Sequence, residues 1–71
     1  MSAENYWKVV NAVKQYIEQN NYRRPTVKEI CDITGISATS HVLYLMMRAV
    51  EAGDLVEEGE ARTSRRFGLP Q

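Results

Sequence analysis

The sequence has little of what catalytic and metal-binding sites need. Its 71 residues include one histidine, one cysteine and four glycines, with no glycine-rich phosphate loop. A single cysteine cannot form an internal disulfide, and metal ligands come in clusters that this composition cannot supply. No nucleophile is paired with a base in a recognisable pattern. We therefore expect a protein that is not an enzyme and that uses no cofactor and no metal.

Long apolar runs and an excess of charge of one sign are also missing. No apolar run is long enough to cross a bilayer, and the N-terminus lacks the pattern of a secretion signal. Nine basic residues balance nine acidic ones, unlike in an indiscriminate nucleic-acid binder. These features predict a cytoplasmic protein with no membrane partner, and no small-molecule substrate is evident.

The charges that are present are unevenly distributed near the C-terminus. Residues 51–60 carry five acidic side chains and no basic one, whereas residues 61–71 carry three arginines and no acid. An acidic strip beside a basic tip discourages loose phosphate binding but leaves one docking orientation favourable.

The stretch from Thr26 to Gly53 predicts two helices joined by a tight turn. Thr26 and Glu29 have the spacing of a capping box, and Gly35 suits the left-handed position that closes a helix. Ser37 is then expected to be the N-cap of the next helix, which Gly53 ends. Two helices joined by a short turn containing glycine are typical of a helix-turn-helix motif.

Apolar residues at helical spacing support these two helices and predict another before them. An amphipathic helix of about four turns is expected from Asn5 onward, followed by an extended link at residues 22–25. The expected apolar stripes are Tyr6, Val9, Val10, Val13, Tyr16 and Ile17 in the first helix, Val27, Ile30, Cys31 and Ile33 in the second, and Val42, Leu45, Met46 and Ala49 in the third.

The C-terminal part predicts a two-stranded hairpin. Leu55 and Val56 form a strand-like pair, and Phe67 and Leu69 alternate with a glycine as in a half-buried strand. Residues 1–71 are therefore expected to form a single domain. Its fold class is mainly α with a small β-hairpin, in the winged helix-turn-helix arrangement of three helices plus a two-stranded wing.

Two segments, RRPTVKEICDITGIS and HVLYLMMRAVEAGDLVEEG, resemble winged-helix bacterial regulators, most closely the DNA-binding domain of the LexA repressor family. The matching features are Pro25-Thr26, the spacing from Gly35 to Gly53, and Leu55-Val56. A looser similarity is to the small fimbrial-operon regulators of the PapI and FaeA type. The resemblance implies sequence-specific double-stranded DNA binding in transcriptional regulation, as a bacterial or phage repressor.

LexA-like proteins continue into a self-cleaving serine protease domain, which has no counterpart in this sequence. The starting methionine and the absence of a trailing linker favour a complete small regulator over a fragment.

In proteins of this class the second helix of the motif enters the major groove, which makes residues 37–48 the expected recognition helix. Its outward side offers hydroxyls, an aromatic ring and a guanidinium, which suit contacts with bases and phosphates. The predicted DNA-binding residues here are Ser37, Thr39, Ser40, His41, Tyr44 and Arg48. This helix is less polar than that of the LexA family, so that family's operator preference is not carried over.

Residues 57–66 are expected to form a basic wing along a neighbouring backbone or minor groove. Cations and hydroxyls at a hairpin match the usual set of backbone contacts, although a solubilising loop would have the same composition. The predicted contacts are Arg62, Thr63, Arg65 and Arg66.

A winged-helix protein-interaction module is the alternative function. Zero net charge, Tyr44 and Met47 favour binding of a partner, or of a second copy, through the apolar third helix and the acidic strip at residues 51–60. A homodimer through Trp7 and the first helix is compatible with both functions, because paired half-sites suit a two-fold protein.

Overall fold

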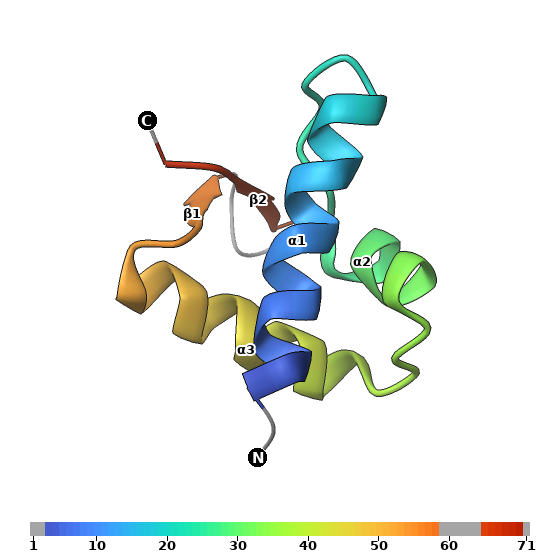
Figure 1. Cartoon of the computed structure of the whole chain (residues 1–71), viewed down its shortest axis with the longest axis vertical. Helices are drawn as coiled ribbons and strands as arrows, with labels where there is room; N and C mark the ends of the chain where they lie inside the picture. The colour runs from blue at the N-terminus through green and yellow to red at the C-terminus, as the bar shows by residue number, and fades with distance from the viewer. Residues whose placement is uncertain (1–2, 59–64, 71) are drawn as a thin grey trace.

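The computed structural model describes residues 3–58 and 65–70. Within them the chain forms three helices and a two-stranded hairpin. The helices are α1 (Ala3–Gln19), α2 (Val27–Thr34) and α3 (Thr39–Ala52), and the strands are β1 (Val56–Glu58) and β2 (Arg66–Gly68). α2 and the hairpin lie on opposite sides of α1, and α3 crosses the end of α1 (Figure 1). The predicted fold class is confirmed, and the layout is compatible with a winged helix.

The hairpin is extended by the link between α1 and α2. β1 and β2 are antiparallel, with Glu58 opposite Arg66. On the other edge of β2, the Phe67 amide donates a 3.0 Å hydrogen bond to the Pro25 carbonyl, and Thr26 forms an antiparallel bridge with Arg66. The sequence predicted an extended link here, but not that it would pair with β2.

The ends of α2 agree with the prediction. The Thr26 amide donates to Glu29 Oε1 at 2.8 Å, and the Glu29 amide donates to Thr26 Oγ1 at 3.3 Å. Gly35 closes the helix with φ 77°, and Gly53 closes α3 with φ 86°. Both glycines adopt a backbone conformation that costs other residues steric strain.

α3 begins later than predicted, and the expected N-cap role of Ser37 is wrong. The N-cap is Ala38, which makes no side-chain capping bond. In the turn, the Ile36 amide donates to Thr34 Oγ1 at 3.3 Å, and Ile36 packs against the core. Because the chain brings Ile36 to the core before it starts α3, the helix begins one residue later than a Ser37 N-cap would place it, and Ser37 lies exposed in the turn.

The two helices of the motif are strongly bent relative to each other. No single helix within residues 3–58 and 65–70 is long and apolar enough to cross a membrane. α2 and α3 together meet that test by length and composition, but they are bent by 107° at the turn. This angle lies in the range of helix-turn-helix motifs.

All three helices and β2 contribute to one buried core. Val9, Ile30, Met46 and Phe67 have no exposed surface, so each element anchors itself through at least one fully buried side chain. Ile33, which was predicted to be in the apolar stripe of α2, is instead 44% exposed. In this short helix the buried stripe consists of Ile30, Cys31 and Thr34, and Ile33 falls to one side of it.

Candidate nucleic-acid interface

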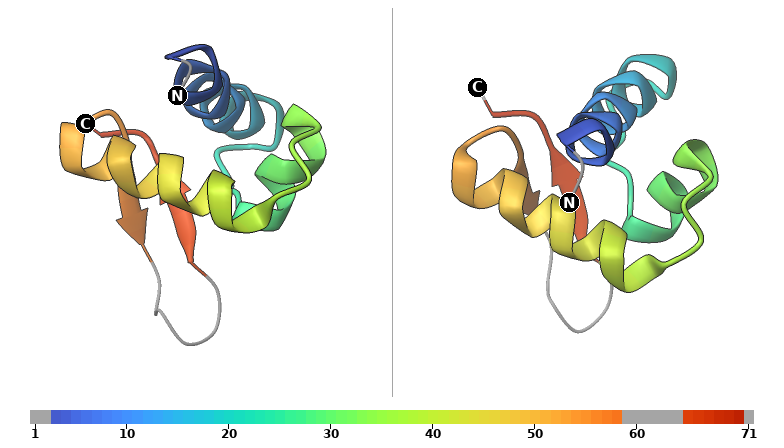
Figure 2. Two further views of the ribbon diagram at one scale, coloured as in Figure 1. Left: turned by 90° about the horizontal axis from the view of Figure 1, so that it is seen from below. Right: turned by 60° about the horizontal axis from the view of Figure 1, so that its bottom comes forward.

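The buried side of α3 determines which of its side chains face solvent. Val42, Met46 and Ala49 have no exposed surface and line the core at helical spacing. On the other side, Tyr44 is 43% exposed and Arg48 is exposed. Figure 2 shows α3 crossing the molecule with α1 on one side and the hairpin strands running out past it on the other. The outward side of α3 therefore faces solvent, with α1 flanking the helix on one side and the hairpin on the other.

Tyr44 and Arg48 form a pair on this outward side. Arg48 Nη1 donates a 3.1 Å hydrogen bond to the Tyr44 hydroxyl, and the guanidinium carbon lies 5.9 Å from the ring centroid. Residues four apart on a helix are neighbours on one face, which allows both contacts. A guanidinium has five N–H donors, so the pair can present an aromatic ring and a cation to a ligand together.

The predicted hydroxyl-bearing residues gather at the beginning of α3. Thr39 and Ser40 are exposed in its first turn, Ser37 is exposed in the preceding turn, and His41 is half-buried. Because the N-cap is Ala38, no side chain caps the first amides of this helix. An uncapped helix N-terminus favours an anionic group, so this end of α3 is chemically suited to a phosphate.

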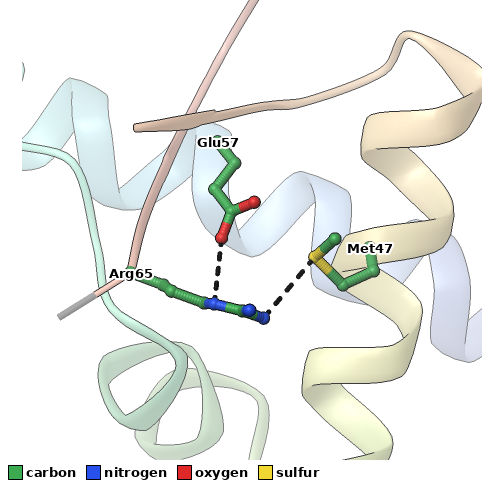
Figure 3. Close-up of polar contacts among 3 residues, drawn as sticks. All are labelled: Met47, Glu57 and Arg65. Atoms are coloured by element: carbon green, nitrogen blue, oxygen red, sulfur yellow. Dashed lines mark hydrogen bonds and ion pairs between the residues drawn. The ribbon is translucent and has the colours of Figure 1, made fainter. Parts of the chain in front are cut away.

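Arg65 connects the hairpin to α3. Its Nε lies 3.2 Å from Glu57 Oε2, and its Nη1 lies 3.9 Å from Met47 Sδ (Figure 3). Met47 is half-buried on α3, so the guanidinium spans the space between β1 and this helix. The predicted wing residue Arg65 therefore lies beside α3, with Glu57 offsetting its charge.

Arg66 points in a different direction from Arg65. Its Nη1 donates a 2.8 Å hydrogen bond to the Arg24 carbonyl in the link between α1 and α2. Successive side chains along an extended segment point to opposite faces, and the two wing arginines accordingly contact different elements. The other predicted wing residues, Arg62 and Thr63, lie outside the described residues.

The described part of the acidic strip, residues 51–58, does not form a single surface. Three of its carboxylates contact partners on different elements: Asp54 accepts a bond from Tyr6, Glu57 pairs with Arg65, and Glu58 pairs with Arg24. Glu51 is exposed on α3, seven residues after Tyr44 and thus on the same face, and Glu60 lies outside the described residues.

Two tyrosines of α1 bind carboxylates of the helix-turn-helix region, which the sequence did not predict. Tyr6 donates to Asp54 Oδ2 and Tyr16 donates to Glu29 Oε2, each at 2.6 Å. The hydrogen bond to the carboxylate raises the pKa of each tyrosine, and the bond from Tyr16 lowers the pKa of Glu29. Both tyrosines fit the apolar stripe of α1 by spacing, so their polar contacts could not be predicted from the sequence.

A metal site and a reactive thiol each set requirements for the described part of the chain. There, no three His, Cys, Asp or Glu side chains come close enough to hold a metal ion. Burial raises the pKa of the Cys31 thiol, which disfavours the reactive thiolate.

Comparisons with known proteins identify no relative of this chain. A scan against protein-family models, a search of curated proteins and a search of solved structures each gave no match. Ser40, Tyr44 and Arg48 are exposed on the outward side of α3, and Thr39 is exposed in its first turn. Arg65 contacts Met47 of the same helix, whereas Arg66 binds the link between α1 and α2.

Proposed function

We propose that the protein binds double-stranded DNA and regulates transcription, with α3 in the major groove and the hairpin along a neighbouring backbone or minor groove. The observation that supports this most strongly is the exposed Tyr44–Arg48 pair on a helix whose opposite side is buried. The resemblance to LexA-like winged-helix regulators supports a role as a bacterial or phage repressor acting in the cytoplasm.

The side chains on α3 suit direct reading of base edges. The major groove is about 12 Å wide and admits an α-helix. Arg48 can donate to guanine or to phosphate, and the ring of Tyr44 can contact a thymine methyl group or a sugar. Ser40, in the first turn, can donate to or accept from any base.

The charge on this face is balanced rather than strongly positive. Arg48 and Arg65 are offset by Glu51 and Glu57. Non-specific affinity depends on phosphate neutralisation, so we expect it to be weak and base contacts to dominate discrimination.

A fluorescence titration tests the proposal. Duplexes enriched from a random pool are expected to bind at low salt with a Kd below about 10 μM, where even non-specific affinity is measurable. Arg48→Ala should weaken binding to all duplexes and reduce the salt slope by about 0.9, whereas Tyr44→Ala should change the preferred sequence. Lys14→Ala on the exposed side of α1 is the matched control and should bind like the parent protein.

Absence of binding at low salt would reject the proposal, as would equal binding by the Arg48→Ala variant and the parent. In that case a protein-interaction module becomes the better candidate, because Trp7 is 49% exposed and Tyr44 is 43% exposed. Sedimentation of the variants distinguishes two modes of dimerisation. If Tyr44→Ala disrupts the dimer, its interface buries α3. If Trp7→Ala disrupts it, the interface lies on α1 and leaves α3 open to DNA.

A further inference from the structure

A cationic surface lies on the side of the hairpin that faces away from α3. It is a shallow, open hollow of about 520 Å³, lined by Tyr22, Arg23, Arg24, Glu58 and Arg66. Three arginines and one glutamate give it an excess of two positive charges, unlike the balanced outward side of α3.

Two of the three arginines, Arg24 and Arg66, are held in place by contacts beside β2. Arg24 Nη2 lies 2.8 Å from Glu58 Oε2, in an ion pair whose side chains are 41% and 49% exposed. Arg66 Nη1 donates to the Arg24 carbonyl. The side chain of Arg24 crosses β2 directly over Gly68, where a Cβ atom would lie only 2.6 Å from Arg24 Nε.

Tyr22 is the aromatic side chain of the hollow, and it is 79% exposed. Its backbone is left-handed, with φ 64°, and its amide donates a 2.9 Å bond to the Ile17 carbonyl at the end of α1. Left-handed backbone angles are sterically unfavourable for a residue other than glycine. Tyr22 nevertheless adopts them while its side chain stays exposed.

We propose that this hollow binds the phosphodiester backbone of DNA, on the strand across the minor groove from α3. The inference rests on the proposed function. In a duplex, one strand separates a major groove from the adjacent minor groove, and we call it the shared strand. The other strand, the far strand, bounds that minor groove on its other side.

With α3 in the major groove and the hairpin in the adjacent minor groove, Arg65 faces the shared strand. Arg24 and Arg66, on the opposite face of the hairpin, face the far strand.

The chemistry of the hollow favours a backbone phosphate over other anions. Small-molecule sites are enclosed and mostly apolar, whereas this hollow is open and lined by charged groups. A protein partner would need buried anchors, and Tyr22 is the only large apolar group in the lining. Exposed ion pairs are weak, so a phosphate can replace Glu58 beside Arg24.

The test compares two variants that each lose two positive charges. Arg23→Gln/Arg24→Gln removes charge from the hollow and keeps the Arg24 carbonyl that Arg66 binds. Lys8→Gln/Lys14→Gln removes exposed charges of α1. Binding to a selected duplex is measured against salt concentration. The arginine variant should bind roughly 10-fold more weakly, with a salt slope smaller by about 1.8, and the lysine variant should match the parent.

Ethylation interference then locates the contact. Ethylated phosphates on the far strand should impair binding of the parent protein but not of the Arg23→Gln/Arg24→Gln variant. Glu58→Gln provides a second test that removes no cation, because it releases Arg24. This variant should bind several-fold more tightly than the parent.

Different results separate this inference from the proposed function. If Arg48→Ala weakens duplex binding while the two double variants bind alike, the α3 interface stands and the hollow is not a phosphate site. If the parent binds no duplex, both proposals fail. A third result would overturn the inference. If the Arg23→Gln/Arg24→Gln variant loses binding to poly-glutamate but binds the duplex like the parent, the hollow is assigned to an acidic protein partner.

Discussion

The Tyr6 hydroxyl donates a 2.6 Å hydrogen bond to Asp54, 48 residues further along the chain. Asp54 follows Gly53, the residue that closes α3, and Tyr6 lies in the first part of α1. The bond therefore fixes the end of the proposed recognition helix to the beginning of α1. Arg48 is close enough to lower the pKa of Tyr6 slightly, against the larger rise due to Asp54.

Tyr6→Phe should lower the free energy of unfolding by roughly 1 kcal/mol, because the half-buried Asp54 loses a donor while the ring remains. Chemical denaturation monitored by circular dichroism measures this. Tyr22→Phe is the matched control, since the Tyr22 ring is 79% exposed, and it should leave stability unchanged. Equal midpoints for Tyr6→Phe and the parent would show that the bond contributes nothing.

Met46 and Met47 are adjacent but should respond very differently to truncation. Met46 has no exposed surface, so Met46→Ala creates a cavity and should cost about 2–5 kcal/mol. Met47 is half-buried beneath Arg65, so Met47→Ala should cost about 1 kcal/mol or less. Denaturation midpoints of both variants check the orientation of α3. A larger loss for Met47→Ala would contradict it.

Glu57→Gln should strengthen duplex binding by roughly 3- to 10-fold at low salt, because it removes the carboxylate that offsets Arg65 beside α3. Titrations with a labelled duplex measure the change. Glu18→Gln on the exposed side of α1 removes the same charge and should have little effect. If both variants gain equally, net charge rather than Arg65 is responsible.

Acid should destabilise the protein through Glu29. Its pKa is lowered in the folded state, chiefly by the bond from Tyr16, so the unfolded chain binds the proton first as the pH falls below the ordinary value of 4.5. The stability that Glu29 contributes is present above this value and is lost as the pH falls through its folded-state pKa. Tyr16→Phe should make the loss of stability as the pH falls below 4.5 shallower. Denaturation at several pH values measures this slope, and an unchanged slope would contradict the assignment.

Local chemistry explains why much of the fold could be predicted from the sequence. The Thr26–Glu29 capping box and the left-handed Gly35 and Gly53 are set by residues within a few positions of one another, and the structure has all of them. The outward orientation of Tyr44 likewise follows from helical spacing against Val42, Met46 and Ala49.

What could not be predicted depends on contacts between distant parts of the chain. The start of α3 is displaced beyond Ser37 because Ile36 packs on a core assembled from other elements. Arg65 and Arg66 looked equivalent in a basic stretch, but strand alternation and the pairing of β2 with the link at Pro25 send them to opposite faces. Nothing near Tyr6 in the sequence indicates Asp54.

Because Gly68 has no side chain, the Arg24 side chain can pack directly on the backbone of β2 at this position. A methyl group there would lie 2.6 Å from Nε of Arg24, so any larger residue must displace this side chain, which forms the ion pair with Glu58. Gly68→Ala would therefore shift the arginine relative to its carboxylate while every formal charge stays in the molecule. The substitution changes no charge. It therefore tests how the position of the Arg24 guanidinium, and not the number of cations, affects that side of the hairpin.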